Sequence, residues 1–285
     1  MRFAVQRVYP VNLGCHSLSI LGVFCCQLLA HTWSMKTFQA EAARASVDAL
    51  ARSGLSWDEF GTEVMSILQR AVPYDGMCFG TIDPMTDLLT GSVKVGIDDP
   101  SEMEFAHHEY VEDRVALFSD LARRDVAVSI LHDETNGDPR QSSRFRELFE
   151  PRFGFGHEMR AMMCIGGRSW GGTALYRATD SSGFSPAEAM FVNSISESLA
   201  LGVRAGLVVS VSRPHLQVQP AENGPAVIIF DTDDEVVSAT LAAQRRVEEL
   251  NGNLWGDMAP SVASALAAAH ALLVGDSHVV PRVVV

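Results

Sequence analysis

The sequence predicts an α+β domain over residues 57–208, in which two β-hairpins are bounded by helices. Three observations predict this fold class. Apolar residues recur at helical spacing before the first strand-like run. Two pairs of short strand-like runs are each joined by turn residues, and a capped helix follows the second pair. No catalytic motif of comparable strength competes with this order of elements.

The helices that precede the sheet are indicated by composition and by a capping pattern. Residues 36–53 are rich in alanine, which favours a helix. Ser56 is followed three residues later by Glu59, the pattern of a capping box, so a second helix is expected to begin there. Its apolar positions continue to Ala71, and Pro73 ends it.

The first hairpin is predicted by two apolar runs with a turn between them. Met77–Ile82 and Leu88–Val95 are expected to pair through the turn Pro84–Asp87. Residues 100–124 then have the apolar spacing of a helix, and Val126–Leu131 is expected to be another short strand.

The second hairpin carries the stronger turn signal. Ser143–Phe149 predicts a short helix before it. His157–Ile165 and Trp170–Arg177 flank the sequence Gly-Gly-Arg-Ser, which is typical of a hairpin connection. Ser185, with proline next and glutamate three residues on, predicts the start of a closing helix over Pro186–Leu207.

By composition the chain divides into four parts: a doubtful leader (1–34), the predicted α+β domain with its preceding helix (36–208), a linker (209–224) and a second, incomplete α/β segment (225–285). Within the last part we expect a buried strand, two helices and a final strand-like run: Pro225–Phe230, Ser238–Leu250, Val262–Leu273 and Val283–Val285.

The leader lacks charged residues between Val8 and Met35. Its core, Leu18–Ala30, has the length of a signal-peptide apolar region and is too short to span a bilayer, so no stable membrane span is expected. We expect the working chain to start at Met35. A secretion signal and a membrane-associating segment remain alternatives, although the residues after Ala30 form a poor cleavage site.

Charge and cysteine usage narrow the class of protein. The formal net charge is −13, and such a surface repels phosphate backbones, so direct nucleic-acid binding by this chain is not expected. The five cysteines are odd in number and form no Cys-x-x-Cys pair. Cys78 and Cys164 lie in apolar runs, which is typical of a reducing compartment and predicts a cytoplasmic protein.

Three blocks of the chain resemble a GAF-type sensor domain, and more narrowly the N-terminal region of actinobacterial LuxR-type transcriptional regulators. They are Leu55–Asp75, Met77–Pro84 and Trp170–Gly206. The last block is the most specific, with a strand ending in Leu-Tyr-Arg, then Phe-Ser-x-x-Glu and a long helix. The resemblance implies a GAF-like, mostly antiparallel sheet. It also implies that the first and last helices lie on one face and a ligand cavity on the other.

The block Gly224–Gly252 is similar to the PAS-like segment that often follows in such regulators. The family's helix-turn-helix should come after it, and no such motif is found in this sequence. DNA binding is therefore implied for the family and not for these residues.

Six residues are candidates for the ligand pocket: Phe79, Tyr110, Phe155, His157, Arg160 and Trp170. Period-two alternation places Met159 and Met163 on one face of their strand and Arg160 on the other. An inward Arg160 would bind a charged ligand group, and an outward one would only be solvated. His157 could hold an anion or a haem iron, although a strand-end histidine without a ligand is favoured. The cofactor is unknown.

Other motifs favour ordinary structural roles. His108 and Glu112 are four residues apart, which gives half of a metal site, but no third ligand follows at a useful spacing, so a solvated helix face is favoured and no metal is expected. The glycine-rich run 166–172 has no Lys-Ser/Thr and reads as a turn.

The sequence thus predicts a non-enzymatic sensor that binds a small molecule or a protein partner and shifts a conformational equilibrium. A homodimer is expected to form through the closing and N-terminal helices. The alternatives are a small enzyme that uses Cys78 or Cys164, and a structural remnant whose pocket is filled by its own side chains.

Overall fold

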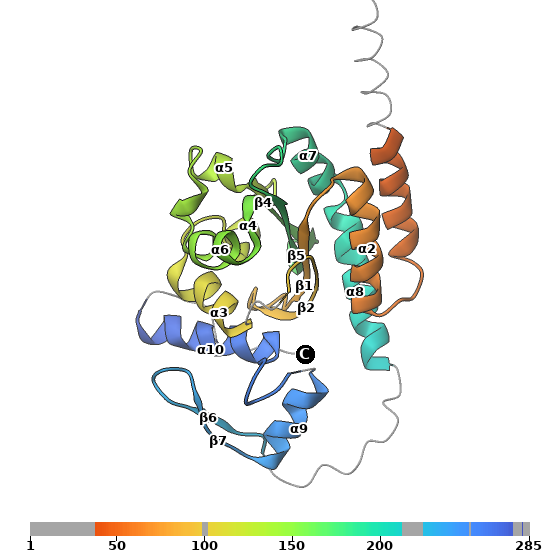
Figure 1. The fold of residues 1–285 in the computed structure, drawn as a ribbon. Coiled ribbons are helices and arrows are strands. Elements are labelled where there is room, and N and C mark those ends of the chain that lie inside the picture. Colours follow the sequence, from red (N-terminus) through yellow and green to blue (C-terminus); the bar gives the residue numbers. More distant parts are fainter. Residues whose placement is uncertain (1–37, 99–101, 213–224, 251, 276–280, 282–285) are drawn as a thin grey trace, which may run out of the picture.

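The structure, a computed structural model, describes residues 38–98, 102–212, 225–250, 252–275 and 281. At its centre lies a five-stranded antiparallel sheet with the strand order β2-β1-β5-β4-β3, and helices cover both faces (Figure 1). The strands are β1 (Gly76–Ile82), β2 (Leu89–Val95), β3 (Val128–Ile130), β4 (Phe155–Ile165) and β5 (Arg168–Ala178). The predicted α+β class and the mostly antiparallel sheet are confirmed.

Both predicted hairpins are present, β1 with β2 and β4 with β5. The two hairpins join through β1 and β5, where Met77 lies opposite Leu175 and Gly80 lies opposite Gly172. The expected short strand is β3, which pairs with the outer side of β4. The sheet is therefore continuous from the first hairpin to the second, as the resemblance to a GAF-type domain requires.

One face of the sheet is covered by α2 (Trp57–Ala71), α8 (Ser196–Ser212) and the first helix (residues 38–50), as Figure 1 shows. Their apolar residues form the largest core cluster with the strands, including Phe60, Phe79 and Val203. The helices approach closely because Gly202 has no side chain: a Cβ there would lie 2.1 Å from Cζ of Phe60. The first and last helices of the domain thus share one face of the sheet.

Gly202→Ala is expected to destabilise the protein by about 1–3 kcal/mol, because the added methyl group forces the Phe60 ring or the helix backbone to move. Chemical denaturation with the slope held common to both proteins measures this difference. Alanine is the better helix former by about 1 kcal/mol. A stabilised variant would therefore show that helix propensity, and not close packing, decides at this position.

The closing helix is not continuous, which corrects the prediction of one helix over Pro186–Leu207. It consists of α7 (Pro186–Ser194) and α8, with Ile195 between them and a bend of 45°. The hydroxyl of Ser196 donates to the Met162 carbonyl and accepts from the Cys164 amide. These bonds hold the first residue of α8 against β4. The predicted capping box at Ser185 is confirmed.

The other face of the sheet carries short helices in place of the single helix predicted over residues 100–124. The chain forms α3 (Glu102–His107), a π-helix η1 (His108–Glu112) and α4 (Phe118–Leu121). The helix is interrupted between η1 and α4, where carboxylates accept hydrogen bonds from backbone amides. The Glu109 carboxylate accepts from the Phe118 amide, and the Asp113 carboxylate accepts from the amides of Arg114 and Val115.

A second group of short elements completes this face. They are α5 (Leu131–Glu134), the 3₁₀ turn η2 (Pro139–Gln141), the π-helix η3 (Phe145–Phe149) and α6 (Glu150–Phe153). The short helix predicted from Ser143 to Phe149 is confirmed in position, but its hydrogen bonding is that of a π-helix.

The C-terminal segment contains a two-stranded sheet, β6 (Ile228–Phe230) with β7 (Val236–Ala239), and two helices, α9 (Leu241–Glu249) and α10 (Pro260–Leu273). Strand β7 occupies the start of the helix that was predicted from Ser238. Helix α10 lies against α3 (Figure 1). It also packs on η1, and the apolar cluster at this contact includes Ala106, Ala263 and Ala267.

Several predictions lie partly or wholly outside the described residues. The leader and the final run Val283–Val285 are among them, and of the expected linker only residues 209–212, which belong to α8, are described. The domain boundaries and the PAS-like similarity stay predictions. Within the described residues no single helix is long and apolar enough to cross a membrane. Among the helices that the structure describes, only the bent pair Pro186–Ser194 and Ser196–Ser210 reaches that length and composition together.

Candidate ligand-binding site

The sheet face opposite α2 and α8 has a patch of small residues at its centre. Cys78 and Gly80 of β1 lie directly opposite Ala174 and Gly172 of β5. We call these four residues the floor. Side chains alternate along a strand, so the bulky neighbour Phe79 faces the helices on the other side. The floor therefore leaves room for a bulky group to approach the sheet backbone.

Aromatic side chains occupy that room from above. Phe105 of α3, Phe118 of α4 and Phe149 of η3 line the space over the floor, and we call these three elements, together with η1 between α3 and α4, the roof. A Cβ added to Gly172 would lie 2.8 Å from Cε1 of Phe118, so this ring rests directly on the floor. The Phe149 ring stacks on the Tyr176 ring with centroids 4.5 Å apart.

The cavity that remains between floor and roof is about 20 Å³. That is room for roughly one water molecule. Its other walls come from Leu89, Lys94, Ile97 and Glu102. Lys94 and Glu102 form an ion pair at the edge, and the Ser92 hydroxyl also donates to Glu102 at 3.0 Å. This pair ties β2 to the start of α3, so it closes one side of the cavity.

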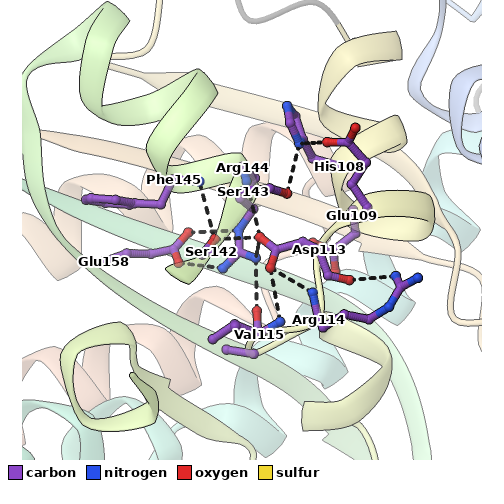
Figure 2. Close-up of polar contacts among 12 residues, drawn as sticks. His108, Glu109, Asp113, Arg114, Val115, Ser142, Ser143, Arg144, Phe145 and Glu158 are labelled. Atoms are coloured by element: carbon purple, nitrogen blue, oxygen red, sulfur yellow. Dashed lines mark hydrogen bonds and ion pairs between the residues drawn. The ribbon is translucent and has the colours of Figure 1, made fainter. Parts of the chain in front are cut away.

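A group of buried charges holds the roof in place beside the cavity. The Arg144 guanidinium lies between two carboxylates, 2.8 Å from Asp113 and 2.6 Å from Glu158 (Figure 2). All three side chains are at most 1% exposed. Asp113 follows η1, Arg144 precedes η3 and Glu158 is on β4, so the group joins both π-helical segments to the sheet.

The pKa values of this group reflect strong mutual attraction. Burial alone would raise the pKa of Asp113, but the Arg144 charge and the hydrogen bonds from Ser142, Val115 and Arg144 outweigh it and lower the pKa. Burial alone would lower the pKa of Arg144, yet the nearby carboxylates, Glu158 foremost, raise it. Asp113 and Arg144 therefore remain an ion pair in spite of their burial.

Arg160 forms a second buried pair closer to the cavity. It donates to Glu109 at 2.8 Å and to the Ala116 carbonyl at 2.8 Å, and its guanidinium lies 3.7 Å from the centre of the Phe118 ring. Its Nε atom is buried and has no hydrogen-bond partner within the described part of the chain. Arg160 lies opposite Ala174 of the floor. The unpaired Nε–H group of Arg160 is therefore next to the cavity.

The structure separates the six predicted pocket residues. Arg160 and Phe155 are on the cavity face. Phe155 stacks on Tyr176, with centroids 5.0 Å apart, beside the cavity wall. Of the two orientations considered for Arg160, the structure has the inward one, and the chain itself occupies two of its nitrogens: Nη2 donates to the Glu109 carboxylate and Nη1 to the Ala116 carbonyl.

Phe79 and Trp170 lie on the opposite face, against the helices. Phe79 contacts Phe60 edge to face at 6.0 Å. Trp170 is the extra residue of a β-bulge: Met163 pairs with Gly171 and Cys164 with Ser169, which leaves Trp170 without a partner on β4. A bulge re-aims a side chain, and Trp170 points to Arg204 of α8. Simple alternation could not place it.

Tyr110 and His157 have their partners outside the cavity. The Tyr110 hydroxyl accepts from the Leu89 amide at 2.8 Å, and the residue packs in the cluster that joins α3 to α10. His157 stacks near His132, with ring centroids 4.9 Å apart, and its Nε2 is 3.0 Å from the Ser181 carbonyl. Neither residue lines the cavity.

A larger open groove of about 880 Å³ lies on the helix side. It is lined by residues of the first helix and α8, together with Trp170, among them Asp48, Arg52, Leu201 and Ala205. It is the face where a homodimer is expected from the sequence, and that homodimer stays a prediction. We consider the smaller cavity the better candidate for a ligand site because the unpaired Nε of Arg160 lies beside one of its lining residues, Phe118, and because Gly80 and Gly172 shape its floor.

No family model matches the chain, and no curated protein matches its sequence. Among solved structures, it is similar to the GAF domain of an Acinetobacter phosphoenolpyruvate-protein phosphotransferase, with 12% identity and a TM-score of 0.40, over 60% of this chain and 97% of that one.

Two further solved structures cover a similar share of the chain. The phycoerythrobilin-bound GAF domain of a cyanobacterial phytochrome has 13% identity and a TM-score of 0.39, over 59% of this chain and 96% of that one. A free methionine-R-sulfoxide reductase from Neisseria meningitidis has 11% identity and a TM-score of 0.40, over 59% and 89%. The GAF-like fold is assigned on the sheet and on its two helices that share one face.

Proposed function

We propose that this chain is a signal-sensing domain that binds a small, mostly apolar ligand between the floor and the roof. The observation that carries the proposal is the two-by-two patch of small residues, which the aromatic rings of three separate elements cover. Ligand pockets are typically about 300–1,000 Å³, so the cavity must open before a ligand enters. Outward rotation of Phe105, Phe118 and Phe149 would provide that space.

The polar groups favour a neutral ligand with one hydrogen-bond acceptor. Two arginines, Arg144 and Arg160, face three buried carboxylates, so the buried group already has an excess of negative charge. An anionic ligand would add to that excess in a region of low dielectric. A carbonyl or ether oxygen would instead satisfy the orphan Nε of Arg160 at no cost in charge.

The roof contacts the C-terminal segment, so ligand binding in the cavity would change the position of the roof relative to that segment. Helix α3 carries Phe105 on the cavity side and Ala106 in the cluster with α10. Tyr110 links the same roof to the edge of β2. A ligand that displaces Phe105 would therefore shift α3 against α10, so the ligand would bias two arrangements of this contact.

We further propose that this sensor belongs to a LuxR-type transcriptional regulator in a reducing, cytoplasmic compartment. The resemblance of Leu55–Asp75 and Trp170–Gly206 supports the regulator, and the free Cys78 and Cys164 support the compartment. With a net charge of −13, these residues are expected to contribute the sensor and not the DNA contact.

A thermal-shift screen with small neutral aromatic and heteroaromatic compounds tests the proposal. A compound present at a hundred times its dissociation constant should stabilise the protein by about 2.7 kcal/mol. A flat response across such a panel would favour the alternative of a structural remnant, in which the aromatic roof fills the pocket permanently.

The second candidate, a cysteine-dependent enzyme, is favoured only by the position of Cys78 on the floor. Burial raises the pKa of this thiol to about 11, and burial also raises the pKa of Cys164. The thiolate is the reactive form. We therefore propose that the chain is not a cysteine enzyme.

Alkylation of Cys78 by iodoacetamide is expected to be slow at pH 7–8 and to become faster as the pH approaches 11, because only then does the thiolate form. Mass spectrometry of the Cys78 peptide measures the rate, and the chain unfolded in guanidinium is the control for intrinsic reactivity. Fast labelling of the folded protein at pH 7 would revive the enzyme candidate.

A further inference from the structure

A histidine and two glutamates lie together on the outer side of the roof. His108 and Glu112 come from η1, and Glu147 comes from η3. One donor atom from each lies within 4.8 Å of the other two. The sequence offered only His108 and Glu112, because Glu147 is 35 residues from Glu112 and reaches them only through the fold.

The local structure explains why these donors converge. The His108 Nδ1 is 3.0 Å from Glu112 Oε2, and its ring is buried, with 7% of the side chain exposed. The same nitrogen is 3.2 Å from the Ser143 hydroxyl, just before η3 (Figure 2). The buried pairs of Arg144 hold η1 and η3 against each other below this surface. The two π-helical segments therefore present their donors to one point.

The donor set suits a divalent cation of the zinc class. An imidazole nitrogen with two carboxylates is a combination that holds Zn²⁺, at roughly 2.0–2.2 Å from each donor atom. Donors around a tetrahedral ion are then roughly 3.4 Å apart, so the separation of His108 and Glu112 needs only a small adjustment. Glu112 is also 3.5 Å from Nε2 of His107 through its other oxygen, which helps to orient the carboxylate.

The competing contacts are weak enough to be displaced. Glu147 pairs with Arg146, but both side chains are more than 40% exposed, and exposed pairs are worth little. Arg146 would retain its bond to the Arg140 carbonyl at 2.9 Å. The two carboxylates give the point a negative charge that a divalent cation would neutralise.

We propose that His108, Glu112 and Glu147 form a binding site for a divalent cation of the zinc class, which ties η1 to η3 across the outside of the roof. The site is separate from the cavity, so it does not depend on the ligand proposed above. A bound ion would restrain η3, which carries Phe149, against η1, which lies along the chain between α3 with Phe105 and α4 with Phe118, and would thereby hold the roof closed.

The test is titration of the full chain with Zn²⁺ alone, followed by isothermal calorimetry, and with Co²⁺ alone, followed by its visible absorption. Wild-type protein should bind one ion saturably. Glu147→Gln should weaken binding at least about tenfold, because even the outer partners of metal ligands are worth 10–100-fold in affinity. Glu112→Gln should have the same effect, and both should reduce the Co²⁺ bands.

The matched control is Glu104→Gln, which also removes an exposed carboxylate that pairs with an arginine, Arg152. It should bind Zn²⁺ with the wild-type affinity. The melting temperatures without metal verify that all three variants fold. Equal Zn²⁺ affinities for wild type and Glu147→Gln, or no saturable binding by the wild type, would overturn the proposal, because any binding would then come from other residues.

Discussion

Arg144→Met is expected to destabilise the protein by about 3–5 kcal/mol, because it leaves Asp113 and Glu158 buried without a counter-charge. Methionine fills much of the arginine volume, so the loss reports on charge more than on packing. The arginine also donates to the Val115 carbonyl at 3.0 Å, which would lose that donor. Urea denaturation at pH 7 measures the effect as a shift of the midpoint at constant slope.

A surface pair provides the control for this substitution. Arg124 pairs with Glu134 through both nitrogens, but the side chains are 36% and 27% exposed. Arg124→Met should therefore cost no more than about 1 kcal/mol. If the two methionine variants were equally stable, the buried charges would not hold the roof in the way the structure indicates.

The cost of Arg144→Met should also depend on pH. The folded-state pKa of Asp113 lies below its ordinary value of 3.8, so its ionised form stabilises the fold above that pH, and this stability is lost as pH falls through the lowered value. In the variant, burial is left without the Arg144 charge and raises the pKa instead. The difference in stability between the two proteins should therefore shrink below about pH 4.

Phe118→Ala is expected to cost about 3–5 kcal/mol and, at the same time, to create a binding site for a small aromatic molecule. The ring is 5% exposed, rests on Gly172 and lies under the Arg160 guanidinium. Its removal leaves an apolar space next to an orphan donor, and engineered apolar cavities bind compounds of the size of benzene. Indole and benzene titrations followed by thermal shift measure the gain in binding.

Phe60→Ala is the matched control on the other face of the sheet. Phe60 is 1% exposed in the core between α2 and the sheet. Its removal should cost a similar amount of stability, but there is no converging donor beside it among the described residues of that core. If both variants bound indole with equal affinity, any apolar cavity in the protein would bind indole, and the floor would not contribute to ligand binding.

The elements that the sequence predicted well are those with local signals. The capping box at Ser185 and the Gly-Gly-Arg-Ser turn each fix the backbone within a few residues, so α7 and the hairpin of β4 and β5 were placed closely. The roof was predicted less well, because one helix was expected over residues 100–124. Glu109 and Asp113 interrupt that helix, since their carboxylates pair with Arg160 and Arg144, which lie far from them in the sequence. Apolar periodicity carries no information about such partners.

The site was predicted only in part, for related reasons. Glu158 and Arg160 are charges within an otherwise apolar strand, and this pattern was the available signal for a buried polar group on one face. The prediction for Trp170 was wrong because the bulge in β5 changes the direction of its side chain. The prediction for Phe79 was wrong because its side chain faces the helices and not the cavity. The floor has no sequence signal of its own, because Gly80 and Gly172 become neighbours only through strand pairing.

The central claim is that the ligand binds between floor and roof. It is tested most directly by two variants, one that fills the cavity between floor and roof and one that fills the open groove on the helix side. Gly172→Val places side-chain atoms where the Phe118 ring now rests, and Ala205→Phe fills the open groove on the helix side. For any compound that stabilises the wild type, Gly172→Val should lose the stabilisation and Ala205→Phe should retain it. Retention by Gly172→Val together with loss in Ala205→Phe would contradict the claim and move the ligand site to the helix side.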